Sequence, residues 1–101
     1  MTDTTDPLDA LPDDVAAAAF RRLVRHLQHR HDAQNIELMG LAGFCRNCLA
    51  DWIREGGYDG DKAAARALVH GMSMEEWKAT RQSEATPQQL AAMQASMAKN
   101  P

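Results

Sequence analysis

The sequence predicts an all-α fold, a compact array of about five helices with one long central helix. No stretch alternates apolar and polar residues with the period of two that a strand requires. Aromatic residues make up 5% of the 101 residues, while alanine and methionine are frequent, a mixture that favours helices over strands. Apolar residues recur at helical spacing between capping signals. An apolar share of 45% and a charged share of 25% are ordinary for one globular domain.

The N-terminal residues differ in composition from the rest. Residues 1–11 carry three aspartates and no apolar run, so we predict a disordered acidic tail followed by a single helical domain over residues 12–101. The tail lacks the basic and apolar regions of a secretory signal, and no segment has the roughly 18 apolar residues of a membrane span. These features predict a cytoplasmic protein that does not enter membranes.

The first two predicted helices carry most of the apolar surface. Residues 13–30 follow Pro12 and place Phe20, Leu23 and Leu27 on one stripe. Residues 32–55, with Asp32 as the expected N-cap, read as the central helix, which is apolar on nearly every side. A domain of this size has few helices with which to cover both sides. We therefore expect a second copy of the chain to cover one of them in a homodimer.

Three shorter helices follow, each with its own start signal. Asp61 can cap a helix over residues 62–70, which Gly71 ends. Ser73 with Glu76 has the spacing of a capping box, and the helix it opens extends to about residue 82. Thr86, followed by proline and then glutamine at the third helical position, starts a last helix through residue 97.

Several strings of this sequence resemble one family. They are residues 32–39 (DAQNIELM), 41–49 (LAGFCRNCL), 20–24 (FRRLV), 74–78 (MEEWK) and 84–87 (EATP). Together they resemble a family of short bacterial proteins known as domain of unknown function 1244, over about residues 20–90. The resemblance implies a small all-helical fold and brings no established activity with it.

Cys45 and Cys48 form a C-x-x-C motif, the feature of this sequence that most resembles a metal-binding or redox site. On a helix, residues three apart share a face, so both thiols can reach one metal ion. The simplest interpretation is that they are small core side chains packed against residues 16–19, since free cysteine is often buried. A zinc site is the first alternative: in an antiparallel hairpin His70 is the histidine brought near the thiols, giving Cys45, Cys48 and His70 as ligands and one ligand missing.

A dithiol redox couple is the second alternative. Redox motifs of this spacing place the first cysteine at a helix N-terminus, where the helix dipole lowers its pKa. Here the motif falls in the middle of the predicted helix. If Gly40 to Gly43 ended that helix, Cys45 would begin a new one and the redox hypothesis would gain support.

Other features point to no enzyme class. The polar face of the first helix is basic, but no aromatic residue lies among its arginines and the net charge is −3, so the sequence disfavours nucleic-acid binding. No glycine-rich phosphate loop and no Ser/His/Asp order is present. The sequence favours an interaction or accessory module that forms a homodimer and also binds an unknown protein partner. A zinc-binding protein and a dithiol redox protein are the alternatives.

Overall fold

The computed structural model describes residues 6–101, which form six α-helices and no strand. The all-α prediction is confirmed, with one helix more than expected. The helices are α1 (Asp13–His29), α2 (Asn35–Ala42), α3 (Arg46–Glu55), α4 (Lys62–His70), α5 (Met74–Thr80) and α6 (Pro87–Met97). No helix among these residues is long and apolar enough to cross a membrane.

The additional helix arises because the predicted central helix is divided at Gly43. This glycine has φ 76°, in the left-handed region, and its N–H donates to the carbonyl of Met39 at 3.0 Å, which closes the last turn of α2. The chain then extends through Cys45, at φ −148°, before α3 begins. The prediction of one helix over residues 32–55 is therefore wrong, because a glycine can end a helix that side-chain periodicity alone would continue.

The start of α2 also differs from the prediction. Asp32 does not cap it but forms a bidentate ion pair with Arg30, with two N···O distances of 2.9 Å. Gln34 is the N-cap, and its backbone N–H donates to Glu37 at 2.9 Å in a capping box. Three other predicted caps are confirmed: Asp61, Ser73 and Thr86 each accept a backbone N–H of the helix that follows.

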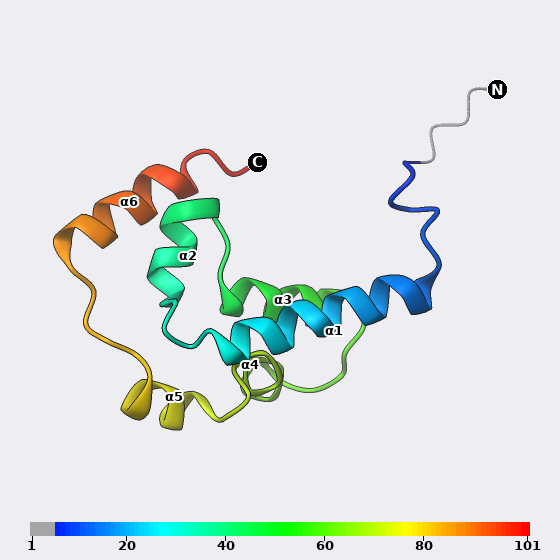
Figure 1. Ribbon diagram of the computed structural model, residues 1–101, viewed down its shortest axis with the longest axis horizontal. Helices are drawn as coiled ribbons and strands as arrows, with labels where there is room; N and C mark the ends of the chain where they lie inside the picture. The colour runs from blue at the N-terminus through cyan, green and yellow to red at the C-terminus, as the bar shows by residue number, and fades with distance from the viewer. Residues whose placement is uncertain (1–5) are drawn as a thin grey trace.

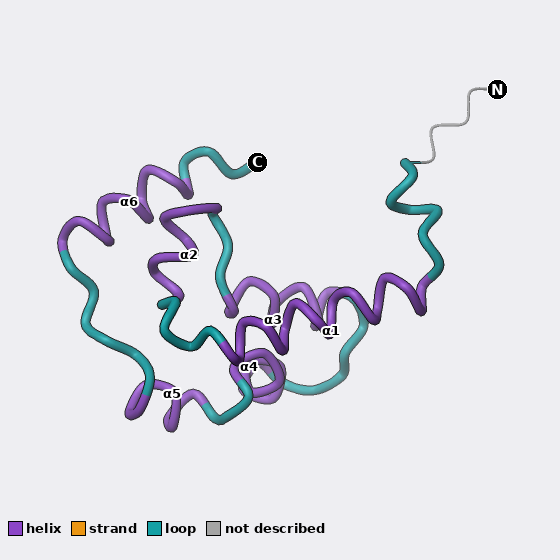
Figure 2. Tube along the Cα trace, viewed as in Figure 1, coloured by secondary structure: helices purple, strands orange, loops and turns teal. Residues whose placement is uncertain are grey.

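The six helices form two packed groups (Figures 1 and 2). In the first, α4 packs against α1, α3 and α5, and the core consists of Leu27, Leu49, Ala50, Ala65 and Val69. In the second, α2 pairs with α6, which returns along it after the long loop that follows α5. A Cβ placed on Gly40 would lie 3.2 Å from the Cβ of Ala92, so the two helices approach closely.

The segment before α1 is exposed throughout. Residues 6–11 form a turn in which the N–H groups of Leu8 and Asp9 both donate to Asp6 at 2.9 Å. Residues 1–5 of the predicted disordered tail lie outside the described residues, so the tail stays a prediction.

We expect Gly43→Ala to lower the free energy of unfolding by about 1–3 kcal/mol, because a side chain at positive φ is strained. Its Cβ would also collide with the side chain of Asn100, whose amide donates to the Gly43 carbonyl at 2.9 Å. Urea denaturation measures the loss. In an Asn100→Ala background the same substitution should cost less, because the collision is removed while the backbone strain remains. An unchanged midpoint for Gly43→Ala would contradict the left-handed helix end.

Candidate functional site

A buried arginine organises the interior where the two groups of helices meet. Arg46 is the first residue of α3 and is fully buried. Its NH1 group donates to the carbonyl of Ala33 (2.7 Å) and to Oδ1 of Asn35 (2.9 Å). Its NH2 group donates to the carbonyls of Leu27 (2.8 Å) and Arg30 (2.9 Å). The guanidinium therefore ties the end of α1 to the start of α2.

No carboxylate among residues 6–101 forms an ion pair with Arg46. The compensating groups are carbonyl oxygens at the negative end of α1 and the ring of Trp77, whose centroid lies 4.8 Å from the guanidinium carbon. Burial lowers the pKa of Arg46 from its ordinary value. An arginine at the first position of a helix opposes the dipole of that helix, and in this case the C-terminus of α1 offsets the cost.

His70 extends this polar interior to α4. Its Nδ1 lies 2.7 Å from the carbonyl oxygen of Arg66, which can only accept, so Nδ1 carries the proton. Nε2 then accepts from the amide of Asn35 at 3.2 Å. The ring packs edge-on against Trp77, with centroids 4.9 Å apart. Arg46, Asn35, His70 and Trp77, which we call the buried polar cluster, thus form one continuous set of contacts.

We expect the protein to lose stability as the pH falls below about 6.5, the ordinary pKa of histidine. Burial lowers the pKa of His70, the hydrogen bond to the Arg66 carbonyl partly opposes this shift, and the charges of Arg46 and Arg66 lower the pKa further. Between the two pKa values, His70 therefore binds a proton in the unfolded chain but not in the folded protein. The stabilisation is complete above the unfolded pKa and is lost as the pH falls towards the lowered folded pKa.

Urea midpoints measured between pH 5 and pH 8 test this expectation. In a His70→Gln variant the slope over this range should be smaller, since the other three histidines are present in both proteins. Asp32 does not interfere, because the hydrogen bond from Arg30 lowers the pKa of Asp32 to about 2. Equal slopes of stability against pH in the two proteins would show that folding does not lower the pKa of His70.

The division at Gly43 places both cysteines at the start of α3. Cys45 is the N-cap and is 5% exposed, whereas Cys48, one turn later, is half-buried. Both are free thiols, and that of Cys48 donates to the sulfur of Met39 at 3.9 Å. Burial raises the pKa of Cys45, although the backbone amides of Cys48 and Asn47 oppose the shift. The first cysteine thus has the helix position that the redox hypothesis requires but not the exposure of a reactive thiolate, and that hypothesis stays a prediction.

The structure brings Cys45 and Cys48 together but does not gather them with His70. Both ring nitrogens of His70 are engaged in the hydrogen bonds given above. Within residues 6–101 no three His, Cys, Asp or Glu side chains are arranged to hold a metal ion. The zinc site made of Cys45, Cys48 and His70 therefore stays a prediction.

The expected packing of the cysteines against residues 16–19 is wrong. Ala16, Ala18 and Ala19 are exposed, and the start of α1 lies beside the end of α3, where Ala16 and Trp52 line one groove. Cys45 instead belongs to the opposite end of α3, next to the end of α1, because Arg46 bonds to the carbonyl of Leu27. Because the chain breaks between α2 and α3, the thiols do not lie beside the start of α1, where one unbroken helix over residues 32–55 would place them.

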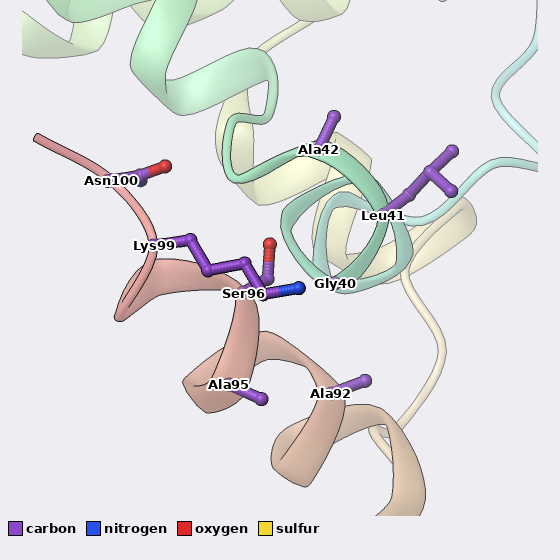
Figure 3. A pocket seen from close by; sticks show the side chains of 8 residues that line it. All are labelled: Gly40, Leu41, Ala42, Ala92, Ala95, Ser96, Lys99 and Asn100. Atoms are coloured by element: carbon purple, nitrogen blue, oxygen red, sulfur yellow. The ribbon is translucent and has the colours of Figure 1, made fainter.

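Surface cavities adjoin these elements, and three of them bear on the argument. One, of about 460 Å³, lies between α2, α6 and the loop after α5 and is lined in part by Cys45, Met39, Asn47 and Met93. A second, of about 490 Å³, lies between α2 and α6. Figure 3 shows that its walls are mostly small side chains, with the Lys99 side chain reaching across it. A third, of about 660 Å³, is the apolar groove between α1 and α3.

Sequence reasoning missed Arg46 and Asn35 as organisers of the interior. The one available signal was an arginine in the first turn of a helix, where acidic residues are favoured. That signal was hidden because the helix was expected to begin at residue 32.

Comparison with known proteins agrees with the family resemblance. A search of functionally curated proteins finds no match to this chain. A family model described as "Protein of unknown function (DUF1244)" matches residues 33–95, more than half of the chain and a range that contains both cysteines and the whole buried polar cluster. The chain therefore belongs to the DUF1244 family.

Proposed function

We propose that this protein is a homodimeric interaction module, in which α1 of one protomer packs antiparallel against α1 of its partner. The observation that carries the proposal is a strip of exposed apolar side chains along α1. Val15, Ala19 and Leu23 follow one another at a spacing of four residues, and Val15 and Leu23 are 47% and 38% exposed. On a helix this spacing makes a continuous strip. The strip replaces the long central helix as the reason to expect a dimer.

The geometry of the strip suits a twofold axis. In an antiparallel pair centred on Ala19, Val15 is level with Leu23 of the partner subunit and Leu23 with Val15 of the partner subunit. Large side chains then meet on both sides of a small central one, and the alanines allow the two helices to approach closely. A single self-complementary patch of this kind is what a twofold dimer requires.

The distribution of charge along α1 also favours pairing with a second copy of the chain in the antiparallel direction. Asp13 and Asp14 lie at the start of α1, while Arg22 and Arg25 lie two to three turns later. Antiparallel pairing about Ala19 sets Asp13 level with Arg25 of the partner subunit, so the acidic start of each helix lies at the height of the arginines of the other helix. Parallel pairing would align like charges, which is unfavourable.

The exposed surface is also large for the size of the chain. The protein exposes 7316 Å², whereas a monomer of 11.1 kDa typically exposes about 5,700 Å². The exposed segment before α1 contributes to the difference. Exposed apolar side chains also contribute, both in the α1 strip and its neighbouring groove, where Trp52 is 52% exposed, and elsewhere, as at Leu41, which is 84% exposed. A typical stable interface hides about 800 Å² on each partner.

Sedimentation equilibrium of the full chain tests the proposal. We expect a dimer of about twice the 11.1 kDa chain mass at micromolar concentration for the native sequence. Ala19→Glu should give a monomer, because it places two carboxylates against each other at the axis. The matched control is Ala91→Glu, an exposed alanine inside α6, which should remain dimeric.

Two results would refute this arrangement. One is a native protein that sediments only as an 11.1 kDa species at 100 µM or about that concentration. The other is an Ala19→Glu variant that dimerises as strongly as Ala91→Glu. Circular dichroism of both variants establishes that the helices are retained.

A further inference from the structure

Three sulfur atoms converge where α2 ends and α3 begins. Cys45 and Cys48 are one turn apart at the start of α3, close enough for each thiol to influence the other. The sulfur of Met39, on α2, lies 3.9 Å from Sγ of Cys48. Met39 and Cys45 line the same cavity. We infer that Cys45, Cys48 and Met39 form a binding site for monovalent copper, with two thiolates and one thioether as ligands.

The chemistry of the donors selects the metal. Thiolate and thioether sulfurs are soft ligands, which favour Cu(I), whereas structural zinc takes four ligands drawn from cysteine, histidine and carboxylates. The described residues offer no third His, Cys, Asp or Glu beside the two thiols. Copper(I) accepts three sulfur ligands in a plane. With metal–sulfur bonds of about 2.3 Å, ligands 120° apart lie about 4 Å from each other, close to the observed Cys48–Met39 separation.

The surroundings compensate the charge of such a site. Binding of Cu⁺ to two thiols releases two protons to solvent and leaves a bis-thiolate complex with one net negative charge. The Arg46 guanidinium is next to Cys45 in the chain, has no carboxylate partner among residues 6–101, and interacts electrostatically with the Cys45 thiol. The amides of Asn47 and Cys48, at the positive end of α3, face the same sulfur. A thiolate pair at this place therefore has one cation and one helix terminus to stabilise it.

A copper ion could reach the two thiols from solvent. Thiols that only fill space in the core would need no such access. Cys48 is half-buried, and Cys45 borders the open cavity of about 460 Å³. Met93 of α6 also lines this cavity. Sulfur side chains at an accessible cavity can accept Cu(I) from a donor molecule by ligand exchange, so that the ion is never released to water.

Anaerobic titration of the reduced full chain with Cu(I), in competition with bathocuproine disulfonate, tests the inference. We expect one equivalent to bind, and X-ray absorption at the copper edge should show sulfur ligands alone. Cys48→Ser should lose the binding. Met39→Leu conserves side-chain volume and should weaken binding at least tenfold, with a change from three sulfur ligands to two. Met97→Leu, at an exposed methionine of α6 outside the cavity, is the matched control and should bind as the native chain does.

The outcomes that overturn the site are equally specific. Absence of competition for Cu(I) by the native chain would refute it, as would a Met39→Leu variant that binds like Met97→Leu. A parallel titration with Zn²⁺ against a chromophoric chelator should show no stoichiometric binding that depends on Met39. Zinc bound at one equivalent, with nitrogen ligands and no response to Met39→Leu, would replace the copper site with the zinc site of Cys45, Cys48 and His70.

Discussion

Replacing Arg46 with methionine should lower the free energy of unfolding by about 3–5 kcal/mol, the cost that follows when one partner of a buried charged network is removed. Methionine has a similar length and no donors. The carbonyls of Leu27 and Ala33 and the side chain of Asn35 would then lose the bonds that Arg46 supplies. An unsatisfied buried acceptor costs about 1–3 kcal/mol, so several of them account for the total.

The matched control for this substitution is Arg54→Met, at an exposed arginine of the same helix. Surface substitutions of this kind usually change stability by less than about 0.5 kcal/mol. Urea denaturation followed by circular dichroism compares the two variants. Arg46→Lys should fall between them, because an ammonium keeps the charge but cannot donate to four acceptors in one plane. Similar midpoints for Arg46→Met and Arg54→Met would show that the guanidinium does not hold the helices together.

Truncating Trp77 to alanine should cost about 3–5 kcal/mol, as do other removals of a large buried aromatic side chain. Trp77 is 1% exposed and packs against both the His70 ring and the Arg46 guanidinium. Its removal leaves a cavity and also uncovers the His70 ring and the Arg46 guanidinium. The same change at Trp52, which is 52% exposed, should cost far less and serves as the control.

A Trp77→Phe variant separates the ring from its N–H group. The indole nitrogen of Trp77 is buried and makes no hydrogen bond in the structure, so phenylalanine gives up no partner when it loses this group. We expect a cost well below that of Trp77→Ala, measured from the same urea midpoints. Equal costs for the two variants would mean that a phenyl ring restores none of the stability that alanine loses, and would contradict a role for an aromatic ring against Arg46 and His70.

Local signals in the sequence predicted most of the helix boundaries correctly. Asp61, Ser73 and Thr86 cap α4, α5 and α6 as expected, because an N-cap satisfies the free N–H groups of its own helix and needs no distant partner. Gly71 ends α4 at positive φ, a conformation that glycine adopts without strain because it has no Cβ. Pro12 and the acidic residues after it begin α1. These features depend on neighbouring residues alone, so the sequence is sufficient to determine them.

The break at Gly43 was only partly predictable. Glycine both weakens a helix interior and favours a helix end, and apolar periodicity on each side of it argued for continuity. The carbonyl of Gly43 bonds to Asn100, 57 residues away, and Gly40 lies against Ala92 of α6. Contacts from the far end of the chain therefore favour two short helices over one long one.

The candidate site shows the same division between local and distant causes. The all-α class and the placing of two thiols one helical turn apart follow from the spacing of residues along the chain. The contact between Met39 and Cys48, and the sharing of Asn35 by Arg46 and His70, follow instead from the packing of distant segments. Those contacts join residues on different helices, and their geometry depends on how the chain turns at Gly43 and on which side chains then fill the interior.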